Sequence, residues 1–322
     1  MRVRTMTCGA AVLVGLFSTA AAQQFPTKPL RMVVPAPPGG SSDIIGRLLA
    51  EHLQKRLGQT VVTENRPGAG QTIGNAFVAK SEPDGHTLLL VTVSYTTSAA
   101  VYAKLPYDPV TDLIGVAMVG AGPLLLTVHP SLPVKSVKQL IALANSRPGS
   151  LNFGSAGAGT IPHMAAELFV ASARVDMVHV PYKGIAPAVT ATVAGEVPVL
   201  FASTPASLAM VRANRLRALA VTTAKRSSLL PELPTVAEAG VPGYDVATWW
   251  GVLAAGKTPA PIVSRLNDEI RSIVGSDDVK ARIAADGAEP VLEMSVERFN
   301  ALLKEDIAKW RRIVKERNIQ AS

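Results

Sequence analysis

The stretch VVPAPPGGSSD, residues Val33 to Asp43 of this 322-residue chain, predicts a strand–turn–helix unit around which the rest of the chain is organised. The apolar segment Leu30 to Val34 predicts a β-strand, and the three prolines that follow end it. Gly39-Gly40 then predicts a turn. The next residues predict an amphipathic helix, whose apolar positions are Ile44, Ile45, Leu48, Leu49, Leu53 and Leu57.

The glycine turn between this strand and this helix can bind an anion. Gly39 and Gly40 let the backbone approach a bound group, and Ser41 or Ser42 can cap the first helical turn. The unpaired N–H groups and the positive end of the helix dipole then favour a ligand such as a carboxylate. The alternative is structural, because any strand–helix unit needs a turn of this kind. The stretch alone leaves both readings open.

The first 22 residues predict a secretory signal peptide rather than part of the fold. Arg2 and Arg4 give a basic start, Ala10 to Phe17 is apolar, and Ala20-Ala21-Ala22 supplies small residues before a cleavage site. The apolar run is too short to span a membrane. We therefore expect cleavage after residue 22 and a mature protein in the periplasm.

The composition of the mature chain excludes several kinds of site. The only cysteine, Cys8, lies in the signal peptide, so the mature chain has no disulfide and no thiolate nucleophile or metal ligand. Without the signal peptide the chain has 30 basic and 24 acidic residues, a net charge of +6. Its one dense basic run, Lys309 to Arg317, is better explained by a solvated helix face than by nucleic acid.

A second glycine-rich stretch repeats the pattern of the first. Phe153 to Thr160 (FGSAGAGT) lies between a predicted strand and a helix that begins at Ile161 or Pro162 and runs to Ala171. Two other polar segments, Ser94–Ser98 and Pro181–Gly184, come directly after predicted strands. In α/β sheets the carboxyl ends of strands are where ligands bind, so these segments are candidates for the same site.

The order of the elements predicts an α/β fold of two domains. Strands alternate with helices, which predicts a mainly parallel sheet flanked by helices in each domain. Two long apolar stretches, Gly115 to His129 and Tyr244 to Ala254, predict strands that cross between the domains, with a cleft for a small molecule between them. The expected boundaries are 1–22 for the signal peptide, 23–122 and 247–322 for a discontinuous first domain, and 123–246 for the second.

Two further segments predict helices in the second domain. Ser136 to Gln139 (SVKQ) forms a capping box, so a helix should begin there and run to about Ser146. Leu233 to Gly240 predicts a short helical segment.

Two nucleotide-binding patterns occur in the chain and are rejected. Gly251 to Thr258 (GVLAAGKT) matches the phosphate-loop pattern, but Pro259 disfavours the helical backbone that Thr258 would need. Gly68 to Gly74 (GAGQTIG) resembles a dinucleotide turn with one residue too many before its third glycine. An exported protein also meets little nucleotide.

The residues give little support for catalysis. His163 lies just inside the helix after the second glycine stretch, where it could reach a ligand or be bonded only to protein. Ser155 and His163 could act as nucleophile and base, but no pattern identifies a third partner. The sequence contains neither a G-x-S-x-G elbow nor an H-E-x-x-H motif, and we expect no cofactor or metal.

A set of blocks spread over the mature chain resembles the Bug-type receptors, the periplasmic solute-binding proteins of tripartite tricarboxylate transporters. The blocks are PPGGSSD (37–43), ENRPGAG (64–70), PDGHTLLL (83–90), GSAGAGTIPHMAAELF (154–169), VPYKG (180–184), LRALAVTT (216–223), LPTVAEAGVPGY (233–244) and KW (309–310).

The resemblance implies a flytrap fold, in which two α/β domains close on a small carboxylate, and it implies which residues contact that ligand. The contacts in such receptors are mostly backbone amides, hydroxyls and bridging waters. The implied first-domain residues are Gly39, Gly40, Ser41, Ser42 and Asp43. The implied second-domain residues are Ser155, Gly157, Gly159, Thr160 and His163, with Ser94, Tyr95, Tyr182 and Lys183 of lower rank.

Two departures from the family pattern bear on the ligand. Many relatives have aspartate at the position of Ala202, where it can receive the ammonium of an amino-acid ligand. Burying an ammonium without a partner is costly, so we expect a carboxylate without an amino group, with an aromatic or hydroxylated body as a candidate. The first turn also has Ala-Pro-Pro (36–38) where relatives commonly have Phe-Pro-Ala.

The sequence therefore predicts a non-enzymatic periplasmic receptor that delivers a small carboxylate to a membrane permease, or reports it to a sensor. We expect a monomer without cofactor, metal or nucleic acid. The alternatives are a secreted hydrolase or lyase that uses the same cleft with His163 as base, and a structural envelope protein without a ligand.

Overall fold

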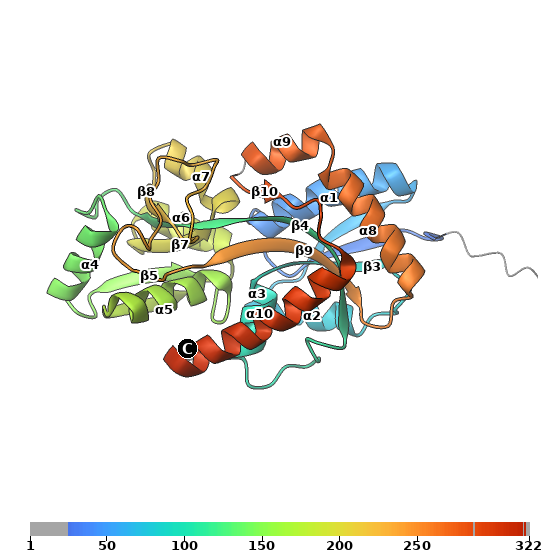
Figure 1. The fold of residues 1–322 in the computed structure, drawn as a ribbon, viewed down its shortest axis with the longest axis horizontal. Coiled ribbons are helices and arrows are strands. Elements are labelled where there is room, and N and C mark those ends of the chain that lie inside the picture. The colour runs from blue at the N-terminus through green and yellow to red at the C-terminus, as the bar shows by residue number, and fades with distance from the viewer. Residues whose placement is uncertain (1–24, 286, 318, 320–322) are drawn as a thin grey trace, which may run out of the picture.

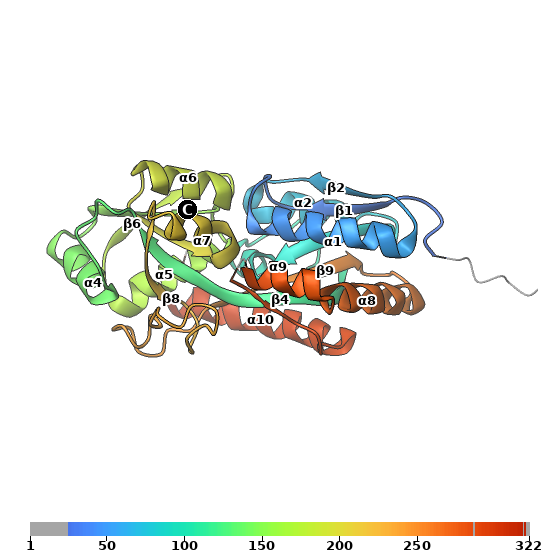
Figure 2. The same cartoon turned by 90° about the horizontal axis from the view of Figure 1, so that it is seen from above.

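A computed structural model of the chain describes residues 25–285, 287–317 and 319, and the predicted signal peptide lies outside them. Two lobes lie side by side along the long axis of the molecule (Figure 1). Two strands, β4 (Leu113–Val128) and β9 (Ala247–Ala255), run from one lobe into the other. Figure 2 shows β4 extending through both lobes.

The first lobe is a sheet with helices on both faces. Its strand order is β2-β1-β3-β9-β4, with the short β10 (Glu289–Pro290) paired to β4. Side chains alternate between the faces along β3, so that Leu88 and Leu90 join one hydrophobic cluster and Leu89 and Val91 another. The remaining strands are β1 (Leu30–Val34), β2 (Val61–Asn65) and β3 (Thr87–Thr92).

Apolar residues of the helices complete these two clusters. One face is covered by α1 (Ser41–Leu57), α8 (Ala260–Val274) and α9 (Asp277–Ala285). The other is covered by α2 (Thr72–Ala79), α3 (Ser94–Val101) and α10 (Val296–Arg317). The near-continuous apolar sequence of β3 thus follows from burial on both sides, as its sequence predicts.

The second lobe is built in the same way around β4, β7, β5 and β6, with β8 on the other side of β4. Phe169 of α5 packs in one hydrophobic cluster with Phe153 and Phe201 of the sheet, and Ala188 of α6 packs with Leu200 in another. The strands are β5 (Leu151–Ser155), β6 (Met177–Pro181), β7 (Val199–Ser203) and β8 (Arg217–Val221). The helices are α4 (Val137–Ser146), α5 (Ile161–Ala173), α6 (Ile185–Ala194) and α7 (Thr204–Arg212).

The two crossing strands make both sheets mixed. The predicted two-lobed α/β fold is confirmed, and the outer pairs β1/β2, β1/β3, β5/β6 and β5/β7 are parallel, as predicted. However, β4 pairs antiparallel with β9 in the first lobe and with β7 and β8 in the second. A strand that leaves a lobe and one that returns to it must run in opposite directions. The predicted parallel pairing therefore holds for β1, β2 and β3 and for β5, β6 and β7, but not for the strands paired with β4 or β9.

Of the two further helices predicted in the second domain, one is present and the other is not. The Ser136 hydroxyl accepts from Gln139 N at 3.2 Å, and Gln139 Oε1 accepts from Lys135 N at 2.6 Å, so the predicted cap of α4 is present. The predicted helix at 233–240 is wrong, because this segment forms turns. Val236 N bonds to Val221 O of β8 at 2.9 Å instead of to a helical carbonyl.

The phosphate-loop match at 251–258 lies mostly within a strand, which agrees with its rejection. Residues up to Ala255 belong to β9, and the Thr258 hydroxyl donates to Ala255 O at 2.7 Å. Helix α8 begins only at Ala260.

Helix α10 packs across β4 and β9, beside α3 (Figure 1). Phe299 and Trp310 on its buried side belong to the main hydrophobic cluster, as the predicted apolar stripe requires. The Trp249 indole on β9 donates to Asp306 Oδ2 at 3.0 Å, and burial raises the pKa of Asp306.

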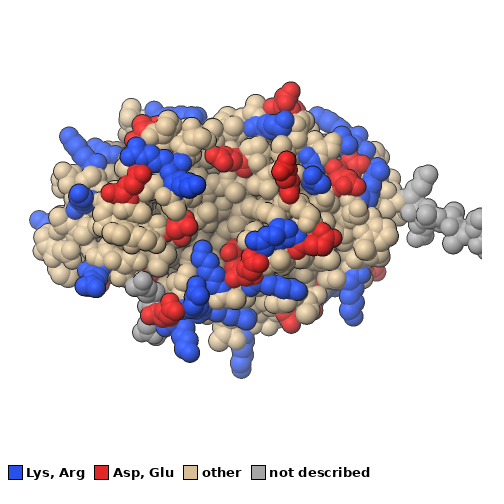
Figure 3. Space-filling view, viewed as in Figure 1, with Lys and Arg blue, Asp and Glu red and all other residues tan. Residues whose placement is uncertain are grey.

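The face shown in Figure 3 is mixed in charge. Lys and Arg are interspersed with Asp and Glu over the face in Figure 3. Within the described residues, no helix combines the length and the hydrophobicity needed to cross a bilayer.

Gly251→Ala should destabilise the protein by about 1–3 kcal/mol, the usual range for overpacking a core. An added Cβ would lie 2.4 Å from Phe299 Cζ and 3.1 Å from Ala117 O. Gly122→Ala on the partner strand is the control, because its nearest contact would be an ordinary 3.4 Å. Urea unfolding measures the free energy of unfolding of both variants. An equal loss of stability in the two would contradict the close packing of Phe299 against Gly251.

Candidate functional site

A cleft of about 610 Å³ lies between the two lobes. Residues of three segments of the first lobe line it, within 35–42, 67–71 and 92–102, and β9 adds Thr248. The second lobe contributes residues of 156–162 and 182–185, together with Ser203. Every one of these segments except β9 follows the carboxyl end of a strand, as expected for an α/β ligand site.

The lining is rich in small apolar residues and hydroxyls and poor in charge. The hydroxyl-bearing residues are Ser41, Ser42, Thr92, Ser94, Tyr102, Thr160, Tyr182, Ser203 and Thr248. Of the described residues that line the cleft, Lys183 alone is charged, and its side chain is exposed. Such a wall suits an anion with an apolar body, held by hydroxyls and backbone N–H groups rather than by several ion pairs.

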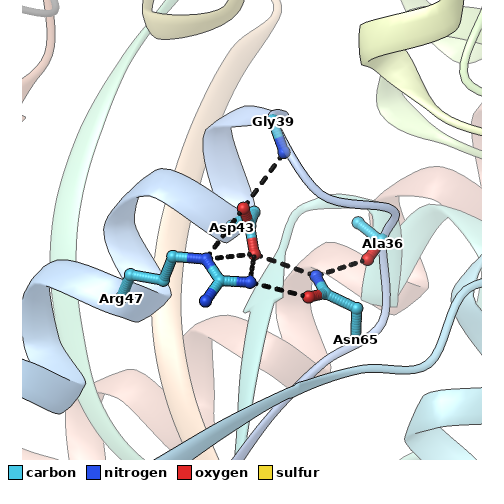
Figure 4. Close-up of polar contacts among 5 residues, drawn as sticks. All are labelled: Ala36, Gly39, Asp43, Arg47 and Asn65. Carbon is cyan, nitrogen blue, oxygen red and sulfur yellow. Dashed lines mark hydrogen bonds and ion pairs between the residues drawn. The ribbon is translucent and has the colours of Figure 1, made fainter.

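In the first lobe, the side chain of Asp43 accepts a hydrogen bond from the glycine turn at Gly39 (Figure 4). Gly39 has the left-handed φ of +83°, and its N–H donates to Asp43 Oδ2 at 3.0 Å. Burial alone would raise the pKa of the Asp43 carboxyl, but hydrogen bonds from Arg47, Gly39 and Asn65 outweigh it and lower that pKa. Asp43 is buried and does not line the cleft. Its observed contacts are therefore those of a carboxylate that supports the turn.

Arg47 and Asn65 complete this support. Asn65 Nδ2 at the end of β2 donates to Asp43 Oδ1 and to Ala36 O, both at 2.9 Å. Arg47 Nε donates to Asp43 Oδ1 at 3.0 Å (Figure 4). Sequence analysis missed both residues. The helical spacing of Asp43 and Arg47 was an available signal, whereas the reach of Asn65 across 22 residues was not.

The start of α1 differs in one respect from its prediction. The residue at the N-cap is Gly40, with extended φ and ψ and no side-chain cap, so neither Ser41 nor Ser42 caps the helix. Both serines lie in the first helical turn and line the cleft. The N–H groups of that turn have no acceptor within the helix, as at every helix N-terminus. They are available to an anion.

In the second lobe, the glycine turn after β5 is held by Ser155 and His163. Gly157 N donates to Ser155 Oγ at 3.0 Å, and Gly159 N donates to His163 Nδ1 at 3.2 Å. The Thr160 hydroxyl closes the turn by donating to Gly157 O at 2.6 Å. Thr160 is also the N-cap residue of α5, and it lines the cleft together with Gly157.

The buried imidazole of His163 and the half-buried imidazole of His179 lie next to this turn. The rings of His163 and His179 are 4.1 Å apart between centroids, and His179 Nε2 lies 2.6 Å from Ser155 Oγ. Burial, reinforced by the neighbouring His163, lowers the pKa of His179 to about 3. A ring with so low a pKa is neutral and a weak base at neutral pH. The partner of Ser155 is thus His179, not His163 as considered from the sequence.

Helix α3 of the first lobe contacts the second-lobe turn directly. The Thr97 hydroxyl donates to Gly159 O at 2.6 Å, and Ile161 N donates to Ser94 Oγ at 3.0 Å. The lobes also meet at Pro37 and Gly184, because a Cβ added at Gly184 would clash with the Pro37 ring. The lobes therefore touch at two places next to the cleft, in a closed arrangement.

The predicted site residues divide into two groups by position. Those that line the cleft are Gly40, Ser41, Ser42, Ser94, Gly157, Thr160, Tyr182 and Lys183. Those that do not line it are Gly39, Asp43, Tyr95, Ser155, Gly159, His163 and Ala202. Ligand contact by any of them stays a prediction.

Tyr95 and Ala202 lie in the hydrophobic core. The Tyr95 hydroxyl donates to Pro109 O at 2.5 Å. Ala202 packs in a cluster with Leu200, while the next residue of β7, Ser203, lines the cleft. The argument against an ammonium ligand therefore rests less on Ala202 than on the absence of an acidic residue among the described residues that line the cleft.

Other lining residues were not predicted. Tyr102 and Thr248 lie in or next to apolar segments that gave no signal of a site. Gly68 to Gln71 was considered only as a dinucleotide turn, yet it forms one wall of the cleft. In the part of the chain that the structure describes, no group of three or more His, Cys, Asp or Glu side chains could hold a metal ion.

Asp43→Asn should lower the free energy of unfolding at pH 7 by about 1–3 kcal/mol, because hydrogen bonds to a charged group are lost. The pKa of Asp43 is lowered on folding, so its stabilisation is present above the ordinary value of 3.8 and is lost as the pH falls through the folded value. Urea unfolding at several pH values should show wild type and variant converging below about pH 4. A difference that stayed constant down to pH 3 would contradict the role of the ionised carboxylate.

Comparisons with known proteins agree with this architecture. The family described as "Tripartite tricarboxylate transporter family receptor" matches residues 45–319. Protein BugT of Bordetella pertussis is 37% identical over 304 residues, covering 94% of this chain and 93% of BugT.

Two solved structures from Rhodopseudomonas palustris share the fold over nearly their full length. Rpa4515, solved with adipate, is 39% identical with a TM-score of 0.89 and covers 92% of this chain and 99% of that one. MatC (Rpa3494), solved with bound malate, is 31% identical with a TM-score of 0.86 and covers 90% of this chain and 100% of that one. With a family match over residues 45–319, the chain belongs to the receptors of the tripartite tricarboxylate transporter family.

Proposed function

We propose that this protein is an extracytoplasmic receptor that binds a small carboxylate in the cleft between its lobes. The observation that carries the proposal is the meeting of two glycine-rich helix starts, those of α1 and α5, at one cleft. Unpaired N–H groups and the positive ends of two helix dipoles favour an anion there. The adipate and malate of the two solved relatives support the same class of ligand.

The ligand that we propose is a carboxylate with an apolar body and without an amino group. Apolar lining residues such as Pro37, Ile161 and Ile185 would contact the body, and hydroxyls would contact the polar ends. An ammonium group would find no carboxylate among the described lining residues, and an unpaired buried ammonium is strongly disfavoured. Lys183 adds a positive charge at an exposed position of the lining.

Binding would be coupled to closure of two domains. We propose boundaries at 23–122 with 247–322 and at 123–246. The change of partner along β4 supports the first boundary, because Pro123 still pairs with β9 whereas Leu124 pairs with β7. A ligand that touches both walls would stabilise the closed state, with the crossing strands as the hinge.

We propose that the protein is not an enzyme. Ser155 is fully buried outside the cleft lining, and its neighbour His179 has a pKa lowered to about 3, so the pair is poorly placed for attack on a bound ligand. His163, the base in the hydrolase or lyase alternative, accepts a hydrogen bond from Gly159 N and is itself 1% exposed. The receptor family of the chain also favours binding without turnover.

The remaining parts of the proposal concern the cell. A signal peptide cut after Ala22 would place the mature protein in the periplasm. We propose that it acts there as a monomer. A membrane permease would receive the ligand, or a sensor would detect its presence. The transporter family of this receptor supports the permease.

Calorimetric titration of the mature protein with adipate, malate and aspartate tests the proposed ligand class. We expect one-to-one binding of at least one of the first two and none of aspartate. The bound acid should also raise the unfolding temperature, because it binds only the native state. Tight binding of aspartate, or no heat and no thermal shift with any carboxylate in a wider panel, would contradict the proposal.

Ser42→Asp tests the anion preference of the first wall. Asp suits the first turn of a helix, but Ser42 is buried, so thermal unfolding first establishes that the variant is folded. The added charge should repel a carboxylate and weaken its binding by at least about tenfold. Ser42→Asn is the matched control of nearly the same size. Equal loss of affinity in both variants would point to size rather than charge and would contradict the expected anion.

A further inference from the structure

The two glycine turns that meet at the cleft are closed by the same device. Gly39 and Gly159 both have left-handed φ angles, +83° and +75°. Each donates its N–H to the side chain four residues further on, Gly39 to Asp43 at 3.0 Å and Gly159 to His163 at 3.2 Å. Both acceptors are the third residue of the helix that follows, and both are buried. The lobes therefore present equivalent turns that are fixed by equivalent side chains.

The chemistry of the two acceptors differs. Asp43 is an anion whose charge is compensated by Arg47. His163 can accept at Nδ1 only as a neutral ring, which then carries its proton at Nε2, 3.5 Å from Glu167 Oε1. A protonated ring would have no acceptor for Gly159, and it would face the ring of His179 at 4.1 Å between centroids. The second turn is thus built around an uncharged acceptor.

Gly159, whose N–H bonds to His163, is also contacted by the other lobe. The N–H of Gly159 bonds to His163, and its carbonyl accepts from the fully buried Thr97 of α3 at 2.6 Å. Tyr102, which follows α3 and lines the cleft, donates to the preceding carbonyl, that of Ala158, at 3.3 Å. The orientation of this one turn therefore decides both the shape of the second wall and the fit between the lobes.

We infer that His163 is a positioning residue, which holds residues 157–160 in the geometry that binds the ligand and receives α3 on closure. This inference rests on the proposed carboxylate-binding function. Like Asp43, His163 accepts the N–H of a turn glycine, but it does so as an uncharged side chain. Among the described charged side chains, only that of Glu167 contacts His163. An acidic residue at position 163 would therefore place a second negative charge beside Glu167, with no cation to compensate it. That charge would also lie close to the wall that binds the anionic ligand.

Substitutions that move the acceptor by one bond test this role. His163→Asn keeps an acceptor at the same number of bonds from Cβ as Nδ1, whereas His163→Gln places it one bond further out. We expect the Asn variant to bind adipate, or the tightest acid of the panel, within about threefold of wild type, and the Gln variant to lose about tenfold or more. His163→Leu, without any acceptor, should resemble the Gln variant.

Amide hydrogen exchange of Gly159, measured by NMR without ligand, provides a readout that is independent of binding. Its exchange should be slow in wild type and in the Asn variant and faster in the Gln and Leu variants, with exchange at Gly39 unchanged. Thermal unfolding confirms which variants are folded, and the Asn–Gln comparison suffices if the Leu variant is not. Equal affinity and equal Gly159 exchange in Asn and Gln variants would overturn the inference. If wild type binds no carboxylate, the proposed function fails, while the exchange data still judge the role of His163.

Discussion

The antiparallel pairing of β4 with β9 is the constraint on which the rest of the structure depends. Strand β4 pairs with β9 in the first lobe and continues into the second, where it pairs with β7 and β8, so the two sheets cannot be built separately. The pairing also fixes which strand ends face each other across the gap. The carboxyl ends of β1, β3, β5, β6 and β7 meet at one cleft, where the segments that follow them form its walls.

A few side chains outside the cleft lining fix the two glycine turns that form its walls. Asp43, with Arg47 and Asn65, fixes the first turn, and His163, with Ser155 and His179, underlies the second. These groups do not line the cleft, yet they determine where its N–H groups and hydroxyls lie. Because charge is kept behind the wall and compensated there, the surface offered to a ligand is almost neutral and depends on dipoles, which suits an anion that must later be released.

Sequence analysis predicted what local patterns encode. The strand–turn–helix units, the cap at Ser136 and the crossing strands could be predicted, because each rests on neighbouring residues or on one long apolar run. The direction in which individual side chains point could not be predicted. Asp43 points back to Gly39, and Ser155 pairs with His179 from the next strand. The side chains of Ala202 and Ser203 point to opposite faces of β7, so that Ser203 lines the cleft and Ala202 packs in the core. Partners distant in sequence leave no signal in a single chain.

The measurement that tests the account most directly is mass spectrometry of the small molecules released when the purified mature protein is denatured. The starts of α1 and α5 and the one lysine, Lys183, lie at a largely apolar cleft. We therefore expect one kind of carboxylic acid without an amino group to be released, at about one molecule per chain. Release of an amino acid, or of an uncharged molecule at that ratio, would contradict an anion-binding cleft and with it the central claim.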